Sequence, residues 1–135
     1  MLNLKKELNQ IKLWEQFIKV YPQTSTVIVK KDALNDVGLY NEMMRYGEDV
    51  NLWIKLLSKK KCYFQKESLV LYDGGKIGFT GEGLAANLKK MHEGEIYNLN
   101  YSRKESLING FCYFLFYSFI KIKYYRRIFI SKIIK

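Results

Sequence analysis

The sequence predicts a helix-rich mixed α/β fold, and three patterns carry this prediction. A run rich in β-branched residues at 24–30 is typical of a strand, and two short apolar runs at 62–64 and 69–72 are expected to be further strands. Apolar residues recur at helical spacing over 48–58. The chain has 135 residues, of which 48% are hydrophobic, so it is large enough for one domain with a core.

The beginning of the chain is expected to be helical. Leucines and isoleucines recur at helical spacing from residue 4 to residue 20, with lysines and glutamates between them. This pattern predicts an amphipathic helix that ends before Pro22, because proline cannot continue a helix. We interpret Trp14 as a core residue of this helix.

Two further helices are expected around the central one. Asp32 is a favourable N-cap for a short helix at 33–37, and Gly38 is the matching C-terminal stop. A longer helix is expected from Thr80 or Gly81 to about Asn98. The only histidine, His92, lies in that helix between apolar positions, and we interpret it as a core or boundary residue.

The helix at 48–58 carries two acids in its first turn, Glu48 and Asp49. On an ideal helix its apolar residues form one broad face, whereas Asn51 and Lys55 lie on the opposite face. Glu48 falls on this wet side and Asp49 on the buried side. The free amides and the positive end of the helix favour a charged carboxylate there, so Asp49 is expected to be poised as a general base. Ordinary first-turn charge or capping is the alternative.

The order and spacing of these features resemble the second half of the catalytic domain of family 2 glycosyltransferases, which are inverting enzymes of the GT-A fold. The similar region runs from about 23 to 83, and its most specific part is Gly-Leu-Tyr-Asn-Glu at 38–42 followed by Glu-Asp-Val-Asn-Leu-Trp at 48–53. In that family the aspartate of the Glu-Asp pair deprotonates the acceptor hydroxyl. The resemblance therefore implies Asp49 as the general base and Glu48 as a residue that helps to orient the site.

The resemblance also implies the substrates. The donor would be a nucleotide sugar, transferred with inversion to the hydroxyl of a glycan or of a lipid-linked acceptor, in bacterial surface polysaccharide or glycolipid synthesis. Trp53, Tyr46 and Arg45 are the residues expected to contact the acceptor.

A glycine-rich segment at 73–83 holds five of the nine glycines. Its spacing fits neither a P-loop nor a dinucleotide-binding motif, so a plain surface loop is one interpretation. Its position also resembles the loop beside the active site of the family. There, Lys76 or Thr80 would contact the donor or the acceptor, and the loop would act as a lid.

The donor side of such an enzyme is not visible in the sequence. The family binds the nucleotide through an N-terminal half, whose Asp-x-Asp motif holds Mg²⁺ or Mn²⁺ against the diphosphate. This chain has no Asp-x-Asp, and no metal site is expected in it. Residues 1–100 are therefore expected to be the acceptor-side half of a GT-A-like domain. Three origins are open: a truncated reading frame, one piece of a split enzyme that works with a separate N-terminal half, or a remnant with a binding role. Alone, the chain is expected to have little or no transferase activity.

Residues 101–135 are expected to be a basic, aromatic extension. From Arg103 onward there are eight basic residues and one acid, so this tail supplies +7 of the net charge of +10. The apolar run at 107–120 is shorter than the roughly 20 residues that span a bilayer. Two helices are expected here, and they either pack on the domain or lie in the interface of an anionic membrane.

The remaining signals concern location and alternative roles. Cys62 and Cys112 have no paired spacing, which is typical of buried free thiols in a reducing compartment. No secretory signal is visible, so a cytoplasmic location is expected, on the inner face of the membrane if the tail binds there. The alternative function is a non-catalytic basic module for a membrane surface or a nucleic acid, although no nucleic-acid motif is present.

Overall fold

The computed structural model describes residues 8–19, 23–65 and 83–133. Short 3-10 helices lie at Thr24–Thr26 and Leu84–Ala86, and the other elements are β1 (Leu8–Ile11), α1 (Glu15–Ile18), α2 (Lys31–Val37), α3 (Glu48–Lys59), β2 (Cys62–Gln65), α4 (Leu88–Lys104) and α5 (Gly110–Ile133). The fold is therefore a helix-rich mixture of α and β, as the sequence predicts, and its sheet has two strands within the described residues.

Helix α3 lies at the centre of the packing and has two apolar neighbourhoods. On one side, Ile54 packs in a core with buried residues of the other helices, namely Phe17 of α1, Leu99 of α4 and Ile120 of α5, and with Ile108. On the other side, Leu52, Trp53 and Leu56 pack against Val37 of α2. The apolar face of this helix was predicted, and its start at Glu48 is confirmed.

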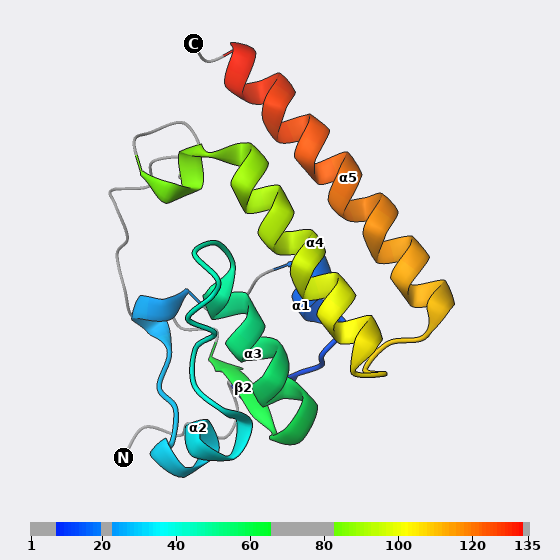
Figure 1. Cartoon of the computed structure of the whole chain (residues 1–135). Helices are drawn as coiled ribbons and strands as arrows, with labels where there is room; N and C mark the ends of the chain where they lie inside the picture. Colours follow the sequence, from blue (N-terminus) through cyan, green and yellow to red (C-terminus); the bar gives the residue numbers. More distant parts are fainter. Residues whose placement is uncertain (1–7, 20–22, 66–82, 134–135) are drawn as a thin grey trace.

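Helices α4 and α5 form a long antiparallel pair that lies along one side of the molecule (Figure 1). Asn109 caps the start of α5, because its side-chain oxygen accepts a hydrogen bond from the backbone amide of Cys112 at 2.8 Å. The expectation of two helices in this tail is wrong: no proline interrupts the run, and α5 is continuous from Gly110 to Ile133. No helix among the described residues is both long and apolar enough to cross a membrane.

The limit expected between the acceptor-side half and the C-terminal extension lies after residue 100. It falls inside α4, which continues to Lys104, and α5 contributes Ile120 to the core that α1, α3 and α4 share. Residues 101–133 therefore belong to the same packed unit as the rest. Helix α4 begins at Leu88, later than predicted, where Asn87 caps it by accepting the amide of Lys90 at 3.1 Å.

The helix expected from residue 4 to residue 20 is not formed over its described part. Leu8–Ile11 is the strand β1, which pairs antiparallel with β2 so that Leu8 faces Gln65 and Ile11 faces Cys62. Only the single turn α1 is helical. Pairing with a strand that is distant in the sequence has overridden the local helical spacing. Trp14, expected in the core, is 48% exposed.

The strand expected at 24–30 is wrong as well. Thr24–Thr26 is a 3-10 helix, and the residues after it are outside any sheet. The side chains still alternate between two sides, as in a strand: Val27 and Val29 pack on the α2–α3 core, whereas Ile28 is fully exposed. An alternating apolar pattern predicts an extended chain, but a strand also requires a partner edge.

The predictions around α2 are confirmed in part. Gly38 ends the helix at a positive φ of 76°, as its stop role predicted. The helix begins earlier than expected, so Lys30 is at the N-cap without a side-chain bond and Asp32 lies in the first turn. The strand at Cys62 is confirmed as β2, whereas the one expected at 69–72 lies outside the described residues.

Candidate functional site

The start of α3 positions Asp49. Gly47 precedes the helix with a φ of 72°, a left-handed conformation that residues with a Cβ rarely adopt. The amide of Val50, one of those at the helix start that lack an intrahelical acceptor, donates to Asp49 Oδ1 at 2.7 Å. The hydroxyl of Thr24 lies 3.4 Å from Asp49 Oδ2. The half-buried carboxylate thus lies at the positive end of the helix, which interacts favourably with its negative charge.

A buried polar network holds this helix start against α4. The side-chain amide of Asn98 donates to the carbonyl of Gly47 at 2.8 Å, and Asn98 Oδ1 accepts from Asn51 Nδ2 at 3.0 Å. Both asparagines are almost fully buried, at 2% and 1% exposure. Asn51 was predicted on the wet face, and this is wrong because α4 covers that side of α3. The network therefore fixes the turn that carries Asp49.

Gly94 allows α4 to approach this turn closely. A Cβ placed on Gly94 would lie 2.4 Å from the backbone oxygen of Tyr46, the residue before Gly47. Only glycine fits there without moving backbone atoms. The helix start and α4 are consequently in direct backbone contact.

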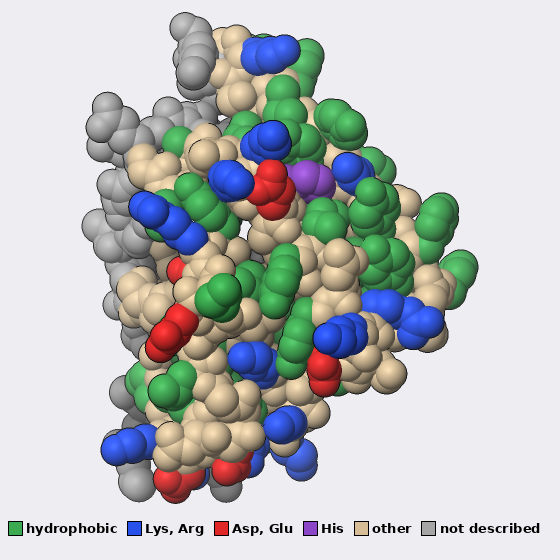
Figure 2. Space-filling view, in the orientation of Figure 1, with side chains coloured by type: hydrophobic (Ala, Val, Ile, Leu, Met, Phe, Trp, Pro, Cys, Tyr) green, Lys and Arg blue, Asp and Glu red, His purple; other side chains and the backbone are tan. Residues whose placement is uncertain are grey.

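A cavity of about 360 Å³ opens beside Asp49, between α1, the start of α3, α4 and α5. Figure 2 shows the molecule hollowed between α4 and the segment that precedes α3. Apolar side chains form most of its wall, including Phe17, Val50, Leu88, Met91 and Ile120. Its polar lining comes from Gln16, Asp49, Glu95, Asn98, Lys123 and Arg127.

Two cations of α5 converge on one acid of α4 at this cavity. Arg127 Nη2 donates to Glu95 Oε1 at 2.5 Å, and Lys123 Nζ lies 3.9 Å from the same oxygen. All three side chains are about four-fifths buried. Burial lowers the pKa of Lys123; Glu95 opposes this shift and Arg127 adds to it.

His92 lies beside Glu95 and is buried, as expected of a core or boundary histidine, but its Nδ1 has no hydrogen-bond partner and is 4.0 Å from Glu95 Oε2. It is 8% exposed and stacks on the ring of Tyr124, with centroids 4.2 Å apart. Burial lowers the pKa of His92 below its ordinary value of 6.5, with Lys121 acting in the same direction and Glu95 against it. The imidazole is therefore neutral at pH 7.

The predicted site residues are distributed unevenly. Among those that the structure describes, Asp49 alone lines the cavity. Trp53 is buried in the α2–α3 core and lines a smaller hollow of about 210 Å³. Thr24 also lines this hollow, and its hydroxyl donates to the carboxylate of Asp49. Glu48 and Tyr46 are half-buried beside the turn, and Arg45 is exposed. Lys76 and Thr80 lie outside the described residues.

Sequence reasoning missed most of the cavity wall. Lys123 and Arg127 are neighbours on α5 through their i,i+4 spacing, but only tertiary packing brings them to Glu95 of α4 and Gln16 of α1. Gly94 was the one available signal, because a glycine inside a predicted helix often marks a close approach.

The remaining groups that could carry chemistry are the two cysteine thiols and the side chains that can ligate a metal ion. Cys62 and Cys112 are free and half-buried, and burial raises the pKa of the Cys62 thiol. Within the described parts of the chain, no three His, Cys, Asp or Glu side chains are close enough to hold a metal ion.

Comparison of the chain with known protein families, curated protein sequences and solved structures finds no match.

Proposed function

We propose that this chain forms the acceptor side of an inverting glycosyltransferase, with Asp49 as the general base. The observation that supports this proposal best is the placement of Asp49, a half-buried carboxylate at a helix N-terminus on the wall of a cavity. A base that works on a bound hydroxyl needs this combination of charge, concave surface and fixed geometry. The resemblance of the Glu48-Asp49 block to family 2 glycosyltransferases supports the same reaction.

The reaction assigned to Asp49 is a single displacement. The acceptor oxygen forms a bond to the anomeric carbon while the bond from that carbon to the nucleoside diphosphate breaks. The electron pair of the broken bond leaves with the diphosphate, and the hydroxyl proton passes to an oxygen of Asp49. The amide of Val50 and the hydroxyl of Thr24 hold the carboxylate for this transfer.

The donor side requires residues that this site does not present. In the family that the chain resembles, an Asp-x-Asp motif holds Mg²⁺ or Mn²⁺ against the diphosphate of the donor. The sequence contains no Asp-x-Asp motif. We therefore assign the donor and the metal to a separate N-terminal half, and no step of the reaction is placed on a metal held by this chain.

The test is Asp49→Asn in the chain reconstituted with a donor half encoded by neighbouring DNA. We expect transfer from the nucleotide sugar to fall by about 10²- to 10⁴-fold, the range for losing a general base. Asp32→Asn is the matched control, because Asp32 is also an acid in a first helical turn but is exposed on α2. Wild-type turnover by Asp49→Asn would remove Asp49 from the mechanism.

A second role, on an anionic membrane surface, is favoured by the outer face of α5. Eight large apolar side chains of this helix are exposed, and at about 100° per residue they fall within an arc of about 140°. They are Phe111, Phe114, Leu115, Phe119, Ile122, Tyr125, Phe129 and Ile133. We call this set the outer stripe. In Figure 2 hydrophobic side chains gather along α5.

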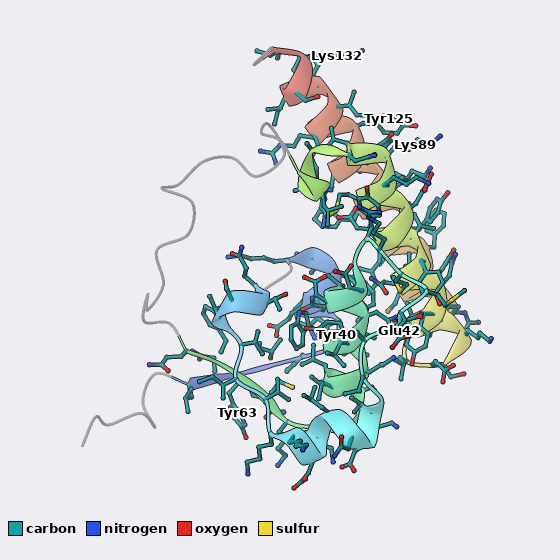
Figure 3. The ribbon with its side chains drawn as sticks, turned by 60° about the vertical axis from the view of Figure 1, so that its left-hand side comes forward. Tyr40, Glu42, Tyr63, Lys89, Tyr125 and Lys132 are labelled. Carbon is teal, nitrogen blue, oxygen red and sulfur yellow. The ribbon has the colours of Figure 1, made fainter. Side chains whose placement is uncertain are left out.

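Charge favours an anionic lipid surface as the partner of the outer stripe. Helix α5 contains five lysines or arginines and no acid. Arg126 and Lys132 are exposed on the same side as the stripe, and Figure 3 shows Lys132 and Tyr125 on the last turns of the helix. Exposed apolar side chains interspersed with cations are typical of helices that lie in a membrane interface. We propose that such a surface holds the chain near a lipid-linked acceptor.

A further inference from the structure

The cavity beside Asp49 contains a polar group that the fold leaves without a partner. Gln16 is 2% exposed and lines the cavity, and neither its side-chain oxygen nor its nitrogen has a hydrogen-bond partner. Leaving a buried polar group unpaired costs about 1–3 kcal/mol. An amide both donates and accepts hydrogen bonds, so a hydroxyl-bearing ligand would satisfy it.

The side of the cavity that α4 and α5 form carries two cations and one acid. Glu95 balances one of the two cations there, and His92 is neutral, so one cation has no acid of its own among the lining residues from α4 and α5; the other acid of the lining is Asp49. At 3.9 Å, Lys123 is beyond hydrogen-bonding distance of Glu95, and Arg127 uses one of its five N–H groups on that acid. Asp49 lies on a different wall, at the start of α3.

Partly buried cations that share one acid favour the entry of an anion. Lys123 and Arg127 have side chains exposed by only 23% and 20%, so water screens them weakly. An anion bound between them would pair with the cation that has no acid beside it on α4 or α5, and arginine matches the oxygens of a phosphate especially well. The volume of about 360 Å³ is near the lower end of small-molecule sites, which suits a single sugar unit.

We propose that the cavity binds a sugar phosphate, with the phosphate on Lys123 and Arg127 and the sugar hydroxyls on Gln16 and Asp49. The inference rests on the proposed function, because it makes this sugar phosphate the acceptor whose hydroxyl Asp49 deprotonates. The phosphate has two possible sources, a free sugar phosphate or a sugar joined through phosphate to a lipid. The apolar wall of Phe17, Met91 and Ile120 would contact the lipid chain in the second case.

The experiment is a titration of the whole chain, followed by NMR, with glucose 1-phosphate, methyl glucoside and inorganic phosphate. We expect glucose 1-phosphate to bind at least about tenfold more tightly than either fragment, because only it engages both the amide of Gln16 and the cations of α5. Equal affinity for inorganic phosphate would overturn the inference, because the sugar would then contribute nothing. Equal affinity for methyl glucoside would overturn it as well, because the cations would then contribute nothing.

Variants locate the binding. We expect Lys123→Gln and Arg127→Gln each to weaken the binding of glucose 1-phosphate by about tenfold or more. Lys123→Gln leaves the bond between Arg127 and Glu95 in place, so it stays informative if Arg127→Gln does not fold. Arg126→Gln is the matched control, because Arg126 is an exposed neighbour on the same helix that does not line the cavity. Unchanged binding by Lys123→Gln would overturn the assignment.

A fourth probe is glucose 1-phosphate carrying a decyl ester on its phosphate. It distinguishes a free sugar phosphate from a sugar joined through phosphate to a lipid. Tighter binding than glucose 1-phosphate supports a lipid-linked acceptor, and weaker binding supports a free one. All these measurements are independent of turnover. If glucose 1-phosphate does not bind, this inference fails and Asp49 remains the proposed base. If it binds but Asp49→Asn turns over normally, the proposed function fails instead.

Discussion

At the scale of single residues, two neighbours on α3 show what a helical projection predicts well and where it misleads. Asp49 was placed toward the buried side, and the structure finds it half-buried on a cavity wall. Asn51 was placed on the wet side, and it is buried against Asn98. Both projections used the same geometry, but the second assumed that only one side of the helix is covered. The polar identity of Asn51 gave no sign of α4 on the other side.

The same scale provides a prediction about pH. His92 has a lowered pKa in the folded chain because burial disfavours its charged form; Lys121 and Arg127 add to the effect, whereas Glu95 and Glu93 oppose it. The unfolded chain therefore takes up a proton near pH 6.5, before the folded chain does. The free energy of unfolding should fall as the pH drops through about 6.5, and recover as it rises again.

The matched variant is His92→Phe, which retains an aromatic ring against Tyr124 and removes the titrating group. Urea unfolding between about pH 7 and pH 5 measures the difference. We expect the wild-type chain to lose more stability over this window than the variant. Parallel pH profiles for the two chains would contradict the assignment of the loss to His92.

At the scale of elements, the position of the site depends on the contact between α3 and α4. This contact is unusual because it is made by backbone and amide groups: Gly94 approaches the carbonyl of Tyr46, and Asn98 binds the carbonyl of Gly47. The apolar core under these groups holds the helices together, but it does not fix the turn before α3 by itself. The glycine and asparagine contacts set the direction from which Asp49 enters the cavity.

We predict that Gly94→Ala destabilises the chain. The new Cβ would lie 2.4 Å from the Tyr46 oxygen, so backbone atoms must move, and such overpacking costs about 1–3 kcal/mol. Replacing glycine by alanine inside a helix otherwise gains up to about 1 kcal/mol, which reduces the loss without cancelling it. Chemical denaturation measures the net change in the free energy of unfolding.

Gly110→Ala is the control for this prediction. It also replaces a helical glycine, but the nearest side-chain atom would be 3.9 Å away, at ordinary contact distance. The control should be neutral or slightly more stable than the wild-type chain. A Gly94→Ala chain as stable as this control would show that the turn before α3 moves at no cost.

At the scale of the whole molecule, α5 has two faces that differ in charge and exposure. Its inner face carries Lys123 and Arg127 to the cavity, paired with Glu95 of α4. Its outer face is apolar, which reverses the usual arrangement in a surface helix. Covering the outer stripe with lipid would remove this exposed apolar area from water and leave the cavity cations in place. The two proposals for α5 are therefore compatible and can be tested separately.

We predict that the chain sediments with vesicles of phosphatidylcholine mixed with phosphatidylglycerol, and about tenfold less with phosphatidylcholine alone. Each exposed cation near an anionic surface contributes about 1 kcal/mol, and Arg126 and Lys132 are exposed beside the outer stripe. The double variant Ile122→Ser with Phe129→Ser should lower vesicle binding by about tenfold or more, because it removes apolar area from the stripe.

Met43→Ser is the control for the vesicle experiment. Met43 is 94% exposed in the loop before α3, so its loss removes apolar surface away from α5. This variant should bind vesicles like the wild-type chain. Equal loss in both variants, or binding to duplex DNA in preference to vesicles, would contradict the membrane proposal and favour a different basic module.

The parts of the fold that were predicted correctly have local causes. Helix α3 has a strong apolar spacing and acids in its first turn, and Gly38 adopts the positive φ that its stop role requires. The N-terminal segment and residues 24–30 were predicted wrongly because their apolar residues pack in structures other than the helix and the strand that their spacing indicated. Leu8–Ile11 found a strand partner in β2, and Val27 and Val29 found an apolar surface without a sheet.

The sequence by itself determined the central helix, the glycine that ends α2 and the acidic first turn that makes Asp49 a candidate base, because these depend on contacts between residues a few positions apart. Tertiary structure alone decided the cavity, the buried asparagine network and the convergence of Lys123 and Arg127 on Glu95. Those features join groups from α1, α3, α4 and α5, and their charges and hydrogen bonds exist only after the helices have packed.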